Sequence, residues 1–118
     1  MHTGNSIPKV KQKTVLDKAL IEMTKKSLGI TLILNQSKVV GIFTDGDLRR
    51  CINNKIDIHK TKISEVMTTD FKTIDSEDLA VDAAEVMEKN KIFSLIVYKN
   101  KKLAGVISMH DLIEARIL

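Results

Sequence analysis

This chain of 118 residues has few aromatic side chains, one cysteine and no long hydrophobic run. Aromatic residues make up 3%, with no tryptophan and Tyr98 as the sole tyrosine, which disfavours proteins that stack single-stranded nucleic acid on aromatic platforms. Cys51 alone can form neither an internal disulfide nor a cysteine-based zinc cage. No apolar run approaches the roughly 20 residues of a membrane span, and the polar N-terminus lacks a signal-peptide core. The absences predict a soluble, cytoplasmic protein with no nucleic-acid or membrane partner.

The residues that are present have a globular balance. Hydrophobic residues make up 43% of the chain and charged residues 29%, which is typical of a folded domain rather than a disordered one. The net charge is +4, and the lysines are scattered along the chain. A small anionic ligand therefore fits this charge as well as a polyanion does.

The chain contains an internal repeat, which becomes visible when it is compared with itself at an offset of 64 positions. A glycine, an aspartate and several apolar residues all coincide in this single register. Such self-similarity predicts two copies of one unit of about fifty residues. The identical pairs are Ala19 with Ala83, Met23 with Met87, Lys25 with Lys89, Lys38 with Lys102, Gly41 with Gly105, Asp47 with Asp111, and Leu48 with Leu112.

Each copy is predicted to have the same order of elements. In the first copy, apolar residues at helical spacing predict a helix from Leu16, and Thr14 with Asp17 resembles a capping box at its start. Two apolar strands and a second helix, which begins at Thr44, follow. The corresponding predictions for the second copy are a helix after Ser76 with Leu79, Ala80, Ala83, Ala84 and Met87 facing inward, strands 95–98 and 103–107, and a last helix from Ser108 that includes Leu118.

The predicted domains are a first repeat over residues 1–53, a linker over 54–66 and a second repeat over 67–118. One copy alone would bury too little apolar surface to offset the entropy of its chain. We therefore expect an α/β (α+β) fold in which two copies, each a small sheet flanked by helices, pair with approximate two-fold symmetry.

One motif in each copy could carry chemistry: glycine, two apolar residues, a hydroxyl residue, two variable residues and aspartate, over residues 41–47 and 105–111. The motif lies where a strand ends and a helix begins, and free N–H groups at a helix start suit a phosphate. The hydroxyl can add a bond, the aspartate can accept from both hydroxyls of a ribose, and the glycine allows close approach to the backbone.

The same residues have a purely structural interpretation. Thr44 with Asp47, and Ser108 with Asp111, also match ordinary capping boxes. Both interpretations stay open, and they are compatible if the cap of the empty state becomes the ligand shell of the occupied one.

With this repeated motif the chain resembles a tandem cystathionine-β-synthase (CBS) domain pair. Further stretches resemble the C-terminal CBS pair of bacterial arabinose-5-phosphate isomerases, namely residues 1–4, 7–8, 23–29, 41–50 and 109–112. That family interconverts ribulose 5-phosphate and arabinose 5-phosphate for Kdo and lipopolysaccharide synthesis. Ser108 departs from it, because a histidine is expected there.

The resemblance implies a regulatory role. The ligand would be an adenine nucleotide such as AMP or ATP, or the nucleotide sugar CMP-Kdo, with no cofactor required. A homodimer and an N-terminal sugar isomerase domain in a longer parent chain are also implied. The implied ligand-binding residues are Thr44 and Asp47 in the first copy, Ser108 and Asp111 in the second, and His110 and Arg49 as anion contacts.

Two further sequence arguments concern the parent protein and the alternatives. Met1 stands where Met67 stands in the repeat, which indicates that the chain was cut from a longer protein. His2, His59 and His110 are far apart, and no set of residues has metal-ligand spacing, so neither a catalytic nor a metal site is predicted. The alternative functions are an oligomerisation module without a ligand and a stand-alone adenine-nucleotide-binding protein.

Overall fold

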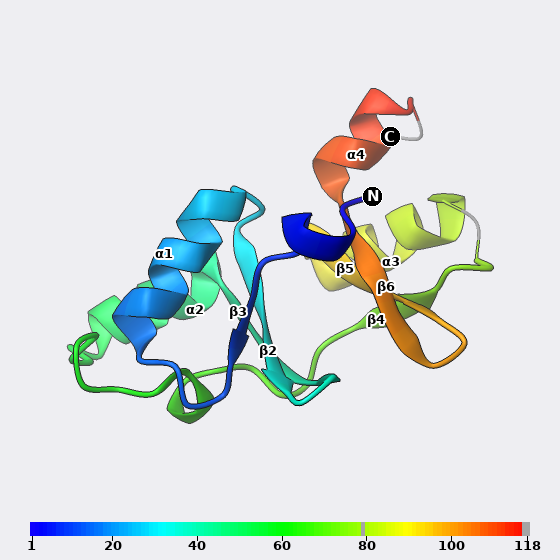
Figure 1. Cartoon of the computed structure of the whole chain (residues 1–118). Helices are drawn as coiled ribbons and strands as arrows, with labels where there is room; N and C mark the ends of the chain where they lie inside the picture. The colour runs from blue at the N-terminus through cyan, green and yellow to red at the C-terminus, as the bar shows by residue number, and fades with distance from the viewer. Residues whose placement is uncertain (79, 117–118) are drawn as a thin grey trace. The chain divides into compact units, whose positions relative to one another are not determined.

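A computed structural model describes residues 1–78 and 80–116 of the chain. The chain divides into two compact units, one formed by Ile7–Phe71 and the other by Met1–Ser6 together with Lys72–Leu118. Each unit holds one three-stranded sheet and two α-helices (Figure 1).

The unit Ile7–Phe71 contains a sheet of strand order β1-β2-β3, in which β1 runs parallel to β2 and β2 antiparallel to β3. Its apolar core joins both helices to this sheet: Leu16, Ala19 and Met23 of α1 and Cys51 of α2 cluster with Ile33 and Phe43 of the strands. The element bounds are β1 Lys9–Lys11, α1 Leu16–Lys26, β2 Ile30–Asn35, β3 Lys38–Thr44, α2 Asp45–Asn53 and a 3-10 turn at Ile63–Glu65.

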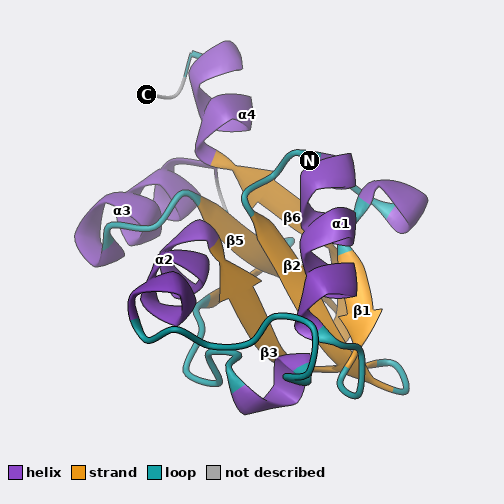
Figure 2. Ribbon diagram, turned by 90° about the vertical axis from the view of Figure 1, so that its left-hand side faces the viewer, coloured by secondary structure: helices purple, strands orange, loops and turns teal. Residues whose placement is uncertain are grey.

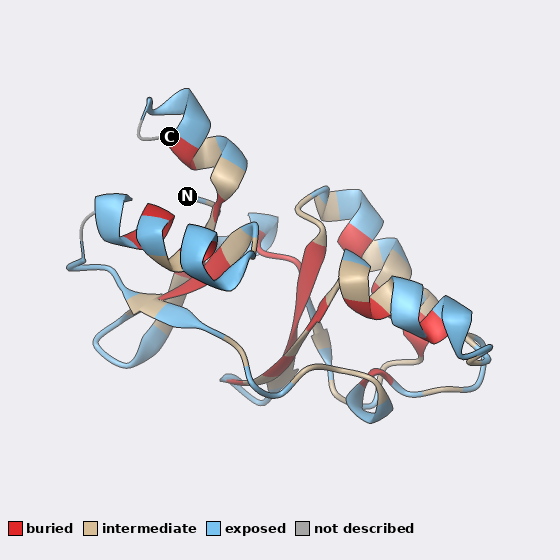
Figure 3. Ribbon diagram, turned by 180° about the vertical axis from the view of Figure 1, so that it is seen from behind, coloured by how far each residue is buried: buried red, intermediate tan, exposed pale blue. Residues whose placement is uncertain are grey.

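The other unit repeats this arrangement with the order β4-β5-β6 and the same strand directions. Ala83, Ala84 and Met87 of α3 form its core with Leu95 of β5 and Leu112 of α4. The buried side of α3 is visible as a red stripe in Figure 3. The element bounds are a 3-10 turn at Gly4–Ser6, β4 Thr73–Asp75, α3 Ala80–Asn90, β5 Ser94–Lys99, β6 Lys102–Ser108 and α4 Met109–Glu114.

Strand pairing confirms the duplication, and the mixture of helices and strands confirms the α/β class (Figure 2). Ile30 pairs with Thr44 in the first copy, and Ser94 pairs with Ser108 in the second. Each hairpin has its register shift at the same place, between Ile33 and Leu34 or at the equivalent step of β5. The offset of 64 found in the sequence is therefore also the offset of the backbone pairing.

The start of α1 differs from the prediction. Thr14 and Asp17 form no capping box, because the N-cap is Val15, whose side chain makes no cap hydrogen bond. The first N–H groups of the helix donate instead to backbone carbonyls downstream: Leu16 to Thr61 at 2.8 Å and Asp17 to Ile58 at 2.9 Å. Tertiary contacts with residues distant in sequence replace the local cap.

The segment predicted as a linker packs onto the first copy. Ile63 is fully buried in the core of the unit Ile7–Phe71, and Ile56, Ile58 and Val66 pack against that core. The compact unit thus extends beyond residue 53 to residue 71. The repeat boundaries 1–53, 54–66 and 67–118 describe the duplication and stay a prediction.

Three residues of the predicted helices of the second copy need separate mention. Ala80, which was predicted to face inward, is exposed. Leu79 and Leu118 lie outside the described residues. Among the helices of residues 1–78 and 80–116, each is too short or too polar to cross a membrane.

Candidate functional site

The junction of β3 and α2 forms the predicted capping box in the first copy. The N–H of Asp47 donates to Thr44 Oγ1 at 3.3 Å, and the N–H of Thr44 donates to Asp47 Oδ2 at 2.8 Å. The Thr44 hydroxyl lies 3.1 Å from the same carboxylate oxygen. The two residues of the motif are therefore brought together by the helix start itself.

The Asp47 carboxylate has two further partners that sequence analysis missed. The hydroxyl of Thr68 donates to Asp47 Oδ1 at 2.8 Å, and the guanidinium of Arg50 donates to the same oxygen. The Asp47 side chain is only 5% exposed, whereas that of Arg50 is 67% exposed. The nearly buried carboxylate is thus held by hydroxyl and backbone donors and neutralised by a cation on its solvent side.

The second copy forms the same capping box at the start of α4. The N–H of Ser108 donates to Asp111 Oδ2 at 2.9 Å, and the N–H of Asp111 donates to Ser108 Oγ at 3.1 Å. Two further groups lie near Asp111: His2, whose Nε2 is 3.5 Å from Oδ1, and the Met1 amino group, which is 3.9 Å from Oδ2. The Asp111 side chain is 20% exposed, so this carboxylate is the more accessible of the two.

The pKa of Asp111 lies below its ordinary value. Burial by itself would raise that pKa, but the hydrogen bonds from the Ser108 backbone and hydroxyl outweigh burial, together with the positive charges of the Met1 amino group and His2. Asp111 is therefore a carboxylate, and an acceptor only, at neutral pH.

The motif glycines allow a close approach, but it is made by the chain itself. A Cβ on Gly41 would lie 2.5 Å from Met67 Sδ, and one on Gly105 would lie 2.5 Å from the carbonyl oxygen of His2. These crossings are fixed by paired backbone hydrogen bonds, between Ile42 and Thr68 in one unit and between Val106 and His2 in the other.

The crossings explain which residues complete each site. Thr68 and His2 follow Met67 and Met1, the two methionines that occupy equivalent places before each copy. The sequence signal for their role was this equivalence of the two preceding segments. The strand with which each segment pairs could not be predicted from the sequence, because it lies far away along the chain: β3 for Thr68 and β6 for His2.

The two predicted anion contacts lie outside these hydrogen-bonded clusters. His110 is exposed, with its Nε2 2.9 Å from Glu114 Oε1. Arg49 is exposed on α2, and its neighbour Arg50 is the arginine that meets Asp47. At the offset of 64, Glu114 replaces Arg50 and His110 replaces Gly46, so the two copies differ in charge beside the shared motif.

Within residues 1–78 and 80–116, no three histidine, cysteine, aspartate or glutamate side chains are placed to hold a metal ion. Cys51 is buried, and burial raises the pKa of its thiol, with a further rise from the nearby charge of Asp47 that Arg50 partly opposes. The thiol therefore stays protonated and packs in the core.

The fold and the repeated motif agree with a protein-family match. The model of the CBS domain matches residues 3–54 and 63–118, and the chain accordingly belongs to the CBS domain family. It is a tandem pair, as the duplication predicted.

Curated relatives confirm the narrower resemblance. The arabinose 5-phosphate isomerases KdsD of Pseudomonas aeruginosa and Yersinia pestis are each 44% identical to this chain over its full length. The chain covers only 37% and 36% of those two proteins, so it spans little more than a third of its relatives.

Solved structures share the fold at low sequence identity. A crystal structure of a CBS domain aligns over 100% of both chains with a TM-score of 0.88 and 22% identity. A CBS domain protein from Pyrobaculum aerophilum, complexed with AMP, aligns with a TM-score of 0.80 and 20% identity over 90% of this chain and 82% of that one. The structure of CBSX2 in complex with AMP aligns with a TM-score of 0.84 and 22% identity, over 99% of this chain and 92% of that one.

Proposed function

We propose that this chain is a cytoplasmic regulatory module that binds a nucleotide or nucleotide sugar within an arabinose-5-phosphate-isomerase-like protein. The observation that carries the proposal is the repetition of one arrangement: in both copies a hydroxyl residue and an aspartate meet at a strand–helix junction. A cap accounts for each pair taken alone, and the recurrence of the same glycine-flanked pair in both copies is what supports paired ligand sites.

The proposed roles follow from the chemistry of each group. Helix N–H groups with the Thr44 or Ser108 hydroxyl would meet a phosphate, and Asp47 or Asp111 would accept from ribose hydroxyls. Because each carboxylate already has donors, a ribose would exchange with the Thr68 hydroxyl in one copy and with His2 in the other. Arg49 and His110 stay proposed anion contacts, and Arg50 is a stronger candidate than Arg49 because its guanidinium already meets Asp47.

The identity of the ligand is proposed from two sides. The AMP complexes of two structural neighbours support AMP or ATP. The similarity to KdsD proteins supports a ligand from the pathway of an arabinose-5-phosphate isomerase. The nucleotide sugar that we propose is CMP-Kdo, the product of Kdo activation. The parent chain would then carry a sugar isomerase domain that interconverts ribulose 5-phosphate and arabinose 5-phosphate for lipopolysaccharide synthesis, which fits the partial coverage of the relatives.

Calorimetric titration of the chain with AMP, ATP and CMP-Kdo tests the proposal. We expect heat from at least one of them, and a loss of affinity of about tenfold in Asp111→Asn, since a charge-assisted hydrogen bond to the ribose is lost. Glu85→Gln, an exposed change on α3, is the matched control. Absence of heat and of any thermal shift with all three compounds would contradict nucleotide sensing.

A second candidate function is self-association, which a specific observation favours. Within the described part of the chain, α1, α2, α3 and α4 each carry one large apolar side chain that is more than half exposed: Ile21, Ile52, Val81 and Ile113. Burying such side chains between two copies of the chain would be favourable, and we propose a homodimer through these helices. Sedimentation velocity should show a dimer that Ile113→Ser weakens; a monomer at every concentration would argue against it.

A further inference from the structure

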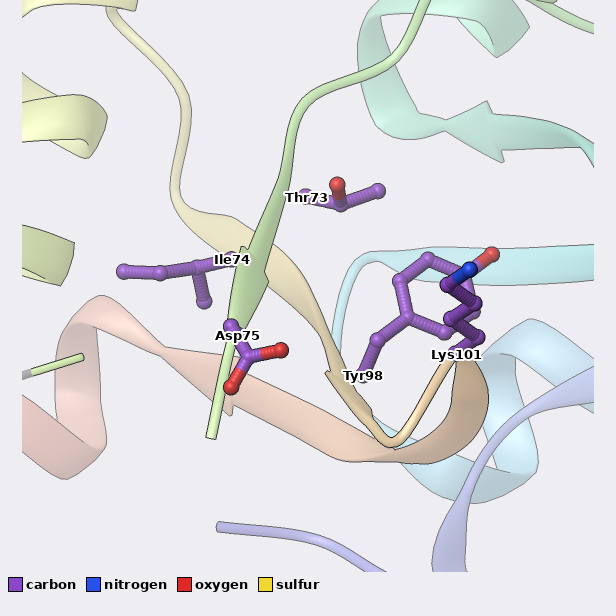
Figure 4. A pocket seen from close by; sticks show the side chains of 5 residues that line it. All are labelled: Thr73, Ile74, Asp75, Tyr98 and Lys101. Carbon is purple, nitrogen blue, oxygen red and sulfur yellow. The ribbon is translucent and has the colours of Figure 1, made fainter. Parts of the chain in front are cut away.

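A pocket of about 370 Å³ lies at the hairpin end of the second sheet, within one compact unit (Figure 4). Thr73, Ile74 and Asp75 of β4 line it together with Tyr98 of β5 and Lys101 of the β5–β6 turn. Tyr98 pairs with Leu103 beside this turn, whereas Ser108 pairs with Ser94 at the other end of the hairpin. The pocket is therefore separate from the motif that ends at Asp111.

The backbone places three of these side chains, those of Thr73, Asp75 and Tyr98, on one face of the sheet. Thr73 and Asp75 alternate along β4 and so project to the same side of the sheet, and Asp75 is in register with Tyr98 on the neighbouring strand. The N–H of Glu77 donates to Asp75 Oδ1 at 2.9 Å, which orients the carboxylate.

Lys101 occupies a strained backbone position. Its φ is +64°, next to Asn100 at +51°, as in the tight hairpin turns that ordinarily place glycine at the second of these positions. A lysine there pays the steric cost of the left-handed conformation, and it sets an ammonium group at the rim of the pocket.

The first copy lacks this set of groups. At the offset of 64, the positions of Thr73, Asp75, Tyr98 and Lys101 are held by Lys9, Lys11, Leu34 and Ser37. In the first turn, residues 35–38, Gln36 is the residue with positive φ. The duplicated fold therefore does not require an acid, a hydroxyl, an aromatic ring and a left-handed lysine at these places.

We propose that this pocket binds a phosphorylated monosaccharide. The Asp75 carboxylate and Thr73 hydroxyl suit sugar hydroxyls, the Tyr98 ring offers a flat apolar surface to a C–H face, and the Lys101 ammonium suits the phosphate. Burial raises the pKa of Tyr98, so its hydroxyl stays protonated and can donate. The volume is at the small end of the roughly 300–1,000 Å³ of ligand pockets, which is enough for one phosphorylated sugar ring.

Titration of the ¹⁵N-labelled chain with ribose 5-phosphate, followed by NMR, tests this site. We expect saturable shifts at Thr73, Asp75, Tyr98 and Lys101, and at least about tenfold weaker binding of ribose alone or inorganic phosphate alone, because each lacks half of the contacts. Shifts absent from these residues at millimolar ribose 5-phosphate would overturn the proposal.

Matched variants separate the pocket from the nucleotide motif. Lys101→Gly removes the ammonium while suiting the left-handed backbone, so the variant keeps its fold and should bind about tenfold more weakly. Lys102→Gln removes an equal charge one position on, outside the pocket lining, and should bind as the parent does. Loss of binding in Asp111→Asn but not in Lys101→Gly would assign the sugar phosphate to the nucleotide motif and refute this pocket. A failure of AMP, ATP and CMP-Kdo to bind leaves the pocket prediction unchanged.

Discussion

At the residue scale, equivalent motif positions have different surroundings. Asp47 is nearly buried and meets the guanidinium of Arg50, while Asp111 is partly exposed and has the imidazole of His2 as its nearest basic side chain. Burial makes an unpaired polar group costly, and partners decide how much of that cost remains. The same residue type at equivalent positions therefore contributes differently to the free energy of unfolding in the two copies.

Substitution of the two aspartates measures this difference. Asp47→Asn should lower the free energy of unfolding by about 2 kcal/mol, because it weakens a cap and leaves Arg50 and Thr68 poorly paired, while Asp111→Asn should cost about 1 kcal/mol. Urea denaturation of both variants gives the comparison. An equal or reversed order would show that the Arg50 and Thr68 contacts add little.

Asp111 also predicts a dependence of stability on acid. Its folded pKa is lowered from the ordinary 3.8, so its contribution to stability is fully present above that pH and is lost as pH falls through the lower folded pKa. Between about pH 5 and pH 2, the free energy of unfolding should fall less with decreasing pH for Asp111→Asn than for the parent chain. Urea denaturation at a series of pH values measures it. Identical slopes would remove Asp111 from the acid response.

Thr31 has a buried hydroxyl whose removal should stabilise the fold. Its side chain on β2 is fully buried, and Thr31 Oγ1 has no hydrogen-bond partner among the described residues. Thr31→Val should raise the free energy of unfolding by about 1 kcal/mol, because an unpaired buried hydroxyl is replaced by a methyl group. Thr69→Val, at an exposed loop position, is the control and should change stability little.

At the element scale, one edge strand of each sheet, β3 or β6, is bridged by a segment from elsewhere in the chain. Residues 67–68 cross β3 at Gly41, and residues 1–2 cross β6 at Gly105. The crossings bring Thr68 to Asp47 and His2 to Asp111. The glycines of the motif thus leave room for the segments that complete each site.

Gly41→Ala tests the crossing at β3. The new methyl group would lie 2.5 Å from Met67 Sδ and 3.1 Å from the Thr68 carbonyl oxygen, so we expect a loss of about 1–3 kcal/mol from overpacking. Thermal or urea denaturation gives the value. Adding Met67→Ala should recover part of the loss, because the sulfur contact disappears; no recovery would mean that the backbone contact dominates.

At the scale of the whole molecule, the compact units differ from the repeats of the sequence. Ile63, which lies in the predicted linker, is fully buried in the core of the unit Ile7–Phe71. Full burial of such a side chain is worth about 1.5–3 kcal/mol. A unit without the segment that follows residue 53 would therefore lose a large part of a typical domain's stability.

Fragments separate the two descriptions. A fragment of residues 7–71 should unfold cooperatively, because it contains the whole core of its unit, whereas a fragment of residues 1–53 should not. Circular dichroism during urea denaturation distinguishes them. Cooperative unfolding of residues 1–53 would show that the repeat boundary is also the folding boundary.

Local pattern determined most of the fold. The periodicity of Leu16, Ala19 and Met23, the apolar strands and the Thr44–Asp47 and Ser108–Asp111 boxes all follow from residues close together in the chain. The duplication was readable because a shared register is a property of the sequence alone. The cap of α1 was not, since its acceptors are the carbonyls of Ile58 and Thr61, far along the chain.

By itself the sequence determined that the molecule is duplicated, which elements each copy contains and where each motif lies. Only the tertiary structure decided which partners complete the motifs: Arg50 and Thr68 for Asp47, and His2 for Asp111. It also decided that the presumed linker belongs to a core. The physical reason is that periodicity and caps are encoded over a few residues, whereas burial and charge pairing depend on segments that meet only after the chain has folded.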